Sequence, residues 1–242
     1  RRYRSGTPPG KASRRKLPPR SLYSRPPRSA EPAMSEASGR ALPGVVDAGR
    51  LFEAIRSDDL DEVSALLDAG VDPDAMIANG ITPIMAASLR GGADIVARLV
   101  EAGASIDAAN GFGSTPLQLA AQHGQVDVIG VLLAAGADVD ARGDDPWSVT
   151  PLMEAARFGQ SGVVAALLRG GADPEIRDGF GRPALMYALD AANTREVVVE
   201  FLDLGVRIAH PGGDTSLDIV VDRHDIDDLV EILAAADVRV SR

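Results

Sequence analysis

A short pattern that recurs at a nearly fixed spacing constrains this chain more than any other feature. It is clearest in the run Thr-Pro-Leu-Gln-Leu-Ala-Ala at residues 115–121, and changed copies occupy four other places. The steps between the first positions of the copies are 33, 35, 33 and 32 residues. Such a period is typical of proteins built from stacked structural repeats, in which each unit packs on its neighbours. The first positions are Thr82, Thr115, Thr150, Pro183 and Thr215.

The residues of one unit predict two helices followed by an extended connection. Thr before Pro is a helix start, because the Thr oxygen caps free N–H groups and Pro lacks an N–H that would otherwise stay unsatisfied. A narrow stripe of Leu and Ala follows, and then a second helix such as that at residues 94–100. Glycine readily takes the left-handed conformation that ends a helix. The second helices are therefore expected to end at Gly70, Gly103, Gly136, Gly171 and Gly205.

Three recurring runs make the chain resemble the ankyrin-repeat family: Thr-Pro-Leu-x-x-Ala-Ala, Ile/Val-Val-x-x-Leu-Leu and Ala-Gly-Ala-Asp. The resemblance implies an all-α, ankyrin-type solenoid of about six helix–turn–helix repeats joined by β-hairpin turns. The family usually has His after the Leu, and the hydrogen bonds that this His makes between repeats are left open here. Met can fill the same volume by packing. The position holds Met85, Gln118, Met153, Met186 and Asp218.

The repeats also predict how the chain is organised. Residues 1–33 are rich in Pro, Arg and Ser, lack apolar periodicity and are expected to be a basic, disordered tail. Residues 34–48 are expected to be a linker, and residues 49–242 the ankyrin-repeat domain. We place the repeats at about 49–80, 81–113, 114–148, 149–181, 182–213 and 214–242, with polar caps at both ends.

Three interpretations of the tail remain open. It could lie upstream of the true start, because Met34-Ser35-Glu36 looks like an ordinary beginning. It could be a solvated tail with no set role. It could also be a basic arm for nucleic acid or anionic surfaces, or a Pro-rich ligand.

The net charge of −10 hides a division between the tail and the body. Residues 1–33 hold 10 Lys+Arg and one acid, which sum to +9, and the rest holds 15 Arg and 34 acids, which sum to −19. An acidic body repels nucleic acid and favours a partner protein with a basic surface. We therefore expect the repeat domain to bind no nucleic acid.

Several classes of function are disfavoured by what the sequence lacks. It has no Cys, and its three His residues show no metal-ligand spacing. No apolar run approaches the ~20 residues of a membrane helix, and no signal-peptide core follows the basic N-terminus. The polar run 222–225 has the composition of a solvated turn rather than of a catalytic cluster. We predict a cytoplasmic, monomeric protein that is not an enzyme and holds no metal or cofactor.

The resemblance also implies which residues contact a partner, namely those on the hairpin tips and on the exposed face of the first helices. Trp147, in a turn lengthened by two residues, is either an exposed anchor or a side chain that folds back on its own hairpin. Phe112 and Phe180 either face a partner or pack on a neighbouring hairpin. The predicted contact residues are Asn79, Ile81, Leu89, Arg90, Phe112, Ser114, Gln122, His123, Trp147, Glu154, Arg157, Phe158, Phe180, Arg182 and Tyr187.

Two functions follow from these observations. The first is a non-enzymatic scaffold that binds a partner protein, expected to be basic, through its concave face and hairpin tips. The alternative is an inhibitor or immunity-type protein that neutralises a cationic enzyme or toxin by mimicking a polyanion.

Overall fold

The structure is a computed structural model that describes residues 43–143, 147–189 and 194–204. This part of the chain is helical and contains no strand. Its α-helices come in pairs, and a short 3-10 helix, η2 at Ala78–Gly80, precedes the second pair. The pairs are α1 (Pro43–Ser57) with α2 (Leu60–Asp68), α3 (Pro83–Arg90) with α4 (Ala93–Glu101), α5 (Pro116–His123) with α6 (Val126–Ala134), α7 (Pro151–Arg157) with α8 (Ser161–Arg169), and α9 (Ala184–Leu189) with α10 (Thr194–Asp203).

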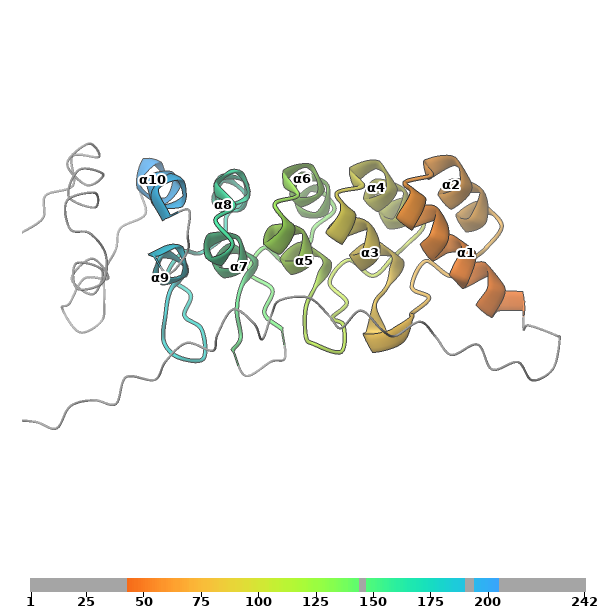
Figure 1. Cartoon of the computed structure of the whole chain (residues 1–242), viewed down its shortest axis with the longest axis horizontal. Helices are drawn as coiled ribbons and strands as arrows, with labels where there is room; N and C mark the ends of the chain where they lie inside the picture. Colours follow the sequence, from red (N-terminus) through yellow and green to blue (C-terminus); the bar gives the residue numbers. More distant parts are fainter. Residues whose placement is uncertain (1–42, 144–146, 190–193, 205–242) are drawn as a thin grey trace, which may run out of the picture. The chain divides into compact units, whose positions relative to one another are not determined.

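Consecutive pairs stack in two layers. Each first helix contacts the first helix of the next pair, from α1 through α3, α5 and α7 to α9. The second helices contact one another in the same order. Figure 1 shows the connections to α3, α5, α7 and α9 projecting beyond the first helices, away from the second helices. The fold therefore has a layer of first helices edged by projecting turns.

Each Thr-Pro pair begins a first helix as the sequence predicts, but the expected cap forms at Thr115 and Thr150 and not at Thr82, whose hydroxyl makes no capping bond. Thr115 accepts a hydrogen bond from the backbone N–H of Gln118, and Gln118 accepts one in return from the N–H of Thr115. Thr150 and Met153 form the same reciprocal pair, with the Met153 sulfur as the acceptor. Each reciprocal pair satisfies two N–H groups that the first turn of a helix leaves open.

The expected glycines end the second helices. Gly70, Gly103, Gly136 and Gly171 have φ angles of +88°, +90°, +90° and +94°. A residue with a Cβ would be strained in this left-handed conformation, which Gly adopts without penalty. Gly205 lies outside the described residues.

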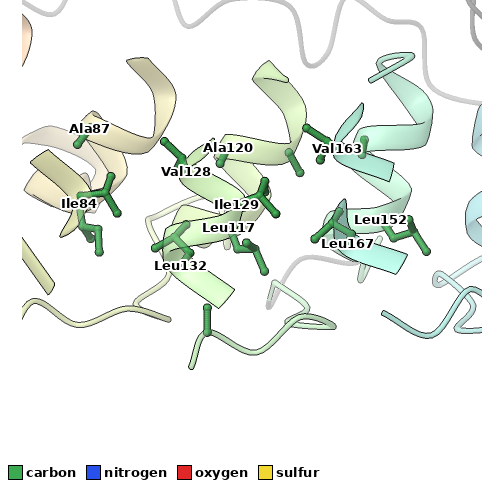
Figure 2. Packing of buried hydrophobic residues seen from close by; sticks show 14 of the residues in the cluster. Ile84, Ala87, Leu117, Ala120, Val128, Ile129, Leu132, Leu152, Val163 and Leu167 are labelled. Carbon is green, nitrogen blue, oxygen red and sulfur yellow. The ribbon is translucent and has the colours of Figure 1, made fainter. Parts of the chain in front are cut away.

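The core runs between the two layers and from one pair to the next. One cluster joins Leu117 and Leu152 of the first helices with Ile129, Leu132 and Leu167 of the second helices, and Figure 2 shows Leu117 near Ile129 and Leu152 near Leu167. The first helices place small alanines in the core, where they allow close packing. Met85 and Met153 are fully buried at the position of the missing His, so the prediction that Met fills this volume is confirmed.

Two expectations need correction. Helix α1 begins at Pro43, so residues 43–48 are helical and the linker expected at 34–48 does not extend over them. The turns that precede α3, α5, α7 and α9 contain no strand among their described residues, although hairpin-like hydrogen bonds close those before α3, α5 and α9. Their pairing is too short to form a ladder.

The tail at 1–33 and the repeat at 214–242 lie outside the described residues.

Candidate functional site

Two of the projecting turns, those before α5 and α9, are built around a side-chain acceptor. The Oδ1 atom of Asn110 accepts hydrogen bonds from the backbone N–H groups of Phe112 at 2.9 Å and Ser114 at 3.0 Å. In the later turn, Oδ1 of Asp178 accepts the same two bonds, from Phe180 and Arg182 at 2.8 Å each. This closed turn holds the residue between the two donors in a fixed position. We call residues 76–81, 110–114 and 178–182, together with Trp147, the turn tips.

Backbone hydrogen bonds connect neighbouring turn tips. The N–H of Gly111 donates to the carbonyl of Asn79 at 2.8 Å, and the N–H of Gly179 donates to the carbonyl of Trp147 at 2.9 Å. The two carbonyls belong to equivalent positions, three residues before Thr82 and Thr150. These bonds pair backbone groups of neighbouring tips and fix the position of one tip relative to the next.

Large apolar side chains are exposed at the turn tips. Met76 is 70% exposed, Phe112 63%, Ile77 47% and Phe180 43%. Single exposed apolar residues are normal on a protein surface, whereas a larger exposed apolar patch is typical of an interaction site. Phe180 and Phe112 were predicted from the sequence, whereas Met76 and Ile77 were not. Ile77 precedes Thr82 by the same five residues that separate Asn110 from Thr115, so the spacing places it in a turn, but Asn110 is buried and the spacing alone does not indicate that Ile77 is exposed.

Trp147 and Phe180 pack against each other across neighbouring tips. Their ring centroids are 4.9 Å apart and their planes are tilted by 36°. Trp147 is half-buried and also contacts the core. Trp147 therefore does not project alone as an anchor. For Phe180 the packing on a neighbouring turn is confirmed, although much of its ring remains exposed.

A buried carboxylate anchors the last described tip. The Oδ2 atom of Asp178 accepts hydrogen bonds from the hydroxyl of Tyr187 at 2.6 Å and from the guanidinium of Arg182 at 2.9 and 3.0 Å. Burial alone would raise the pKa of Asp178, but the hydrogen bonds from Tyr187, Arg182 and Phe180 outweigh it and lower the pKa below its ordinary value. Burial, together with the Asp178 carboxylate, raises the pKa of Tyr187 well above its ordinary value. At neutral pH the cluster is a charged Asp–Arg pair bridged by a neutral phenol.

The predicted contact residues fall into three groups. Asn79, Arg90, Phe112, His123 and Phe180 are exposed. The half-buried residues are Ile81, Leu89, Ser114, Gln122, Trp147, Arg157, Phe158 and Arg182.

The third group was wrongly predicted to face a partner. Tyr187 is buried because its ring packs in the core while its hydroxyl bonds to Asp178. Glu154 is buried beside Arg157, with a nitrogen–oxygen distance of 3.8 Å. These two residues support the surface from beneath and do not form it.

Carboxylates line the connections that lead from the second helices to the tips. Asp74 accepts hydrogen bonds from the backbone N–H and hydroxyl of Ser105, one repeat later. Asp107 accepts from the N–H of Asp138 in the same way, and Asp140 from the N–H of Asp173. We call Asp74, Asp107, Asp140 and Asp173 the carboxylate row. Burial, followed by the charges of Asp173 and Asp138, raises the pKa of Asp140.

Among the described residues, no group of three or more His, Asp or Glu side chains could hold a metal ion. Within the same ranges, no helix combines the length and the apolar character that crossing a bilayer requires.

The geometry defines the class of protein: a stack of helix pairs whose turns project along one edge. The family model for ankyrin repeats (3 copies) matches the chain twice, at residues 51–143 and 150–242. The chain therefore belongs to the ankyrin-repeat family. A search of curated proteins found no match.

Proposed function

We propose that this protein is a non-enzymatic scaffold that binds a partner protein through its turn tips and the exposed side of its first helices. The observation that carries the proposal is the row of exposed apolar side chains at the tips, Met76, Ile77, Phe112 and Phe180. Membership of the ankyrin-repeat family supports protein binding in general. Stacked repeats build an extended surface on which such residues can act together, and we propose that the partner binds its concave side.

The apolar tips are expected to provide most of the binding energy. Burying one large apolar side chain contributes about 1.5–3 kcal/mol. The tips that carry Phe112 and Phe180 are held by the Asn110 and Asp178 acceptors, so little conformational freedom is lost there when a partner covers them. Aromatic side chains, Phe included, are enriched in the buried cores of protein interfaces.

A basic rim on the partner remains part of the proposal. The charged carboxylates of the described tips are limited to Asp178, which is buried and paired, whereas the carboxylate row lies in the connections beside the tips. A partner that covers the tips with apolar residues would therefore meet negative charge at the edge of the interface. Opposite charges at the rim raise the association rate and make it salt-dependent. The net charge of −10 disfavours self-association, which supports a monomer.

The inhibitor or immunity-type function is the second candidate. The carboxylate row is the observation that favours it, because regularly spaced negative charges resemble a polyanion. It makes a separate prediction: replacing these carboxylates by amides would abolish inhibition of a cationic enzyme, whereas tip substitutions would leave it. The reverse pattern would exclude this candidate.

Affinity capture with matched variants tests the scaffold proposal. The full chain is compared with a tip variant, Met76→Ser with Phe112→Ser, and with a control variant, Leu60→Ser with Val126→Ser. The control residues are also exposed, at 38% and 43%, but they lie on the second helices. A protein retained by the wild type and the control but lost by the tip variant is the expected result. Equal retention by all three would show that the tips are not the binding surface.

A further inference from the structure

Two Asn-Gly pairs occur in equivalent turns of this chain but in different environments. Asn79-Gly80 lies in the turn before α3, and Asn110-Gly111 lies in the turn before α5. Asn followed by Gly is the dipeptide most prone to spontaneous deamidation, because Gly has no side chain to shield its backbone nitrogen from the Asn amide. We propose that Asn79 is a deamidation site of the folded protein and that the fold protects Asn110. The inference does not depend on the proposed binding function.

The reaction needs only the chain and water. The backbone nitrogen of Gly80 attacks Cγ of Asn79 and forms a new nitrogen–carbon bond. The bond from Cγ to Nδ2 breaks, and Nδ2 leaves as ammonia with the proton that the backbone nitrogen loses. Water then opens the five-membered imide at either carbonyl and yields aspartate or isoaspartate at position 79.

The side chain of Asn79 is free to reach the reactive geometry. It is exposed, and it makes no hydrogen bond to any residue in the described ranges. The backbone of Asn79 is left-handed, with a φ of +65°. The attacking N–H of Gly80 is held by one bond to the carbonyl of Ile77, at 3.2 Å, the long end of the ordinary range. Breaking this weak bond frees the nitrogen, and the only other hydrogen bond on the same peptide group among the described residues is the one from the N–H of Gly111 to the Asn79 carbonyl, at 2.8 Å.

The bond from the N–H of Gly111 to the Asn79 carbonyl is shared by both asparagines, but Asn110 is held in addition by its own side chain. Its Oδ1 accepts from two backbone N–H groups, at 2.9 and 3.0 Å, and the N–H of Gly111 donates to the Asn79 carbonyl at 2.8 Å. The residue is only 8% exposed, so water has little access to it. All three bonds must open before Gly111 can attack Cγ, and openings of this kind are rare in proportion to the bonds that they break.

Deamidation would change the tip chemically and structurally. Either product places a carboxylate among apolar tip residues. In the isoaspartate product the main chain runs through the former side-chain carbonyl, which displaces the oxygen that accepts from Gly111. The contact between the first two tips is therefore expected to weaken as the protein ages.

Peptide mapping of the full chain by mass spectrometry tests the proposal. Samples are incubated in mildly alkaline buffer, folded in one series and unfolded in urea in the other, and conversion is followed at both Asn residues. The ratio of the unfolded rate to the folded rate gives a protection factor for each residue and removes the effect of local sequence. An Asn79→Gly variant, which keeps the left-handed turn, identifies the products formed at position 79.

We expect the protection factor of Asn110 to exceed that of Asn79 by at least about tenfold, given the additional hydrogen bonds that must break. Folded Asn79 should convert at a rate approaching that of the unfolded chain. Similar protection factors at the two residues, or a larger one at Asn79, would overturn the proposal.

Discussion

The side-chain amide of Gln118 donates a hydrogen bond to the backbone carbonyl of Val149 in the next repeat, at 2.7 Å. The same amide lies 3.4 Å from the carbonyl of Ala141, while its oxygen accepts from the N–H of Thr115. Gln118 occupies the position where the family usually has His. One buried side chain therefore caps its own helix and connects it to the following turn.

Replacing Gln118 by Met, the residue found at this position in other repeats, should destabilise the protein by about 1–3 kcal/mol, because it leaves the Val149 carbonyl without its donor. Urea unfolding followed by circular dichroism measures the change. The control is Gln122→Met on the same helix, where the side chain is half-buried and should tolerate Met. A Gln118→Met protein as stable as wild type would show that the bond to Val149 contributes nothing net.

Asp178→Asn should destabilise the protein at neutral pH. Asn110 shows that an amide oxygen can hold the two backbone bonds of the turn, so the variant loses mainly the charged bonds to Arg182 and Tyr187. Hydrogen bonds to charged groups contribute about 1.5–3 kcal/mol each, and we expect a loss within that range.

The effect of Asp178→Asn should depend on pH in a defined direction. The folded pKa of Asp178 lies below its ordinary value, so its contribution is complete above the unfolded pKa of about 3.9 and is lost as the pH falls towards the folded pKa. The difference in the free energy of unfolding between wild type and variant, measured by urea unfolding, should therefore shrink below about pH 4. A gap that stays constant there would contradict the charged arrangement.

The Asp140→Asn substitution should affect stability in the opposite direction to Asp178→Asn. The raised pKa of Asp140 means that its ionised form is less favourable in the folded chain than in the unfolded chain. The amide keeps an acceptor for Asp173 but removes the repulsion, so we expect the variant to equal or exceed the wild type at neutral pH by up to about 1 kcal/mol. The difference should vanish as the pH falls through the ordinary carboxyl pKa. A clear loss of stability would show that the charged form of the Asp173 bond dominates.

Two glycine substitutions should separate close backbone packing from helix propensity. A Cβ at Gly143 would lie 2.2 Å from the carbonyl oxygen of Gly113, so Gly143→Ala should destabilise the protein by more than about 1 kcal/mol. A Cβ at Gly130, inside α6, would meet nothing within 4 Å. Gly130→Ala should stabilise the protein by about 0.5–1 kcal/mol. Thermal unfolding of both variants measures the difference, and a reversed order would contradict the described approach of the turns.

The fold could be predicted largely because its signals are local and repeated. Thr115 and Thr150 cap helices through atoms three residues away, and Gly103 and Gly136 end helices through their own φ angles. The position of α1 was harder to predict, since its first turn carries no Thr-Pro pair. Helix α1 starts at Pro43, earlier than the repeat pattern suggested.

The candidate site was less predictable because exposure depends on contacts between repeats. Tyr187 looks like a surface residue by its place in the repeat, yet its ring is buried because Asp178 supplies a partner for its hydroxyl. Met76 and Ile77 look like core residues by composition, yet the turn before α3 leaves them exposed. Sequence spacing identifies the turn but not which of its side chains turn inward.

Hydrogen–deuterium exchange of the full chain, alone and bound to the captured partner, tests the binding surface most directly. Slower exchange on binding is predicted at residues 76–81, 110–114 and 178–182 and along α3, α5 and α7, with little change along α4, α6 and α8. Protection confined to the second helices, with unchanged exchange at the turn tips, would contradict the proposed surface.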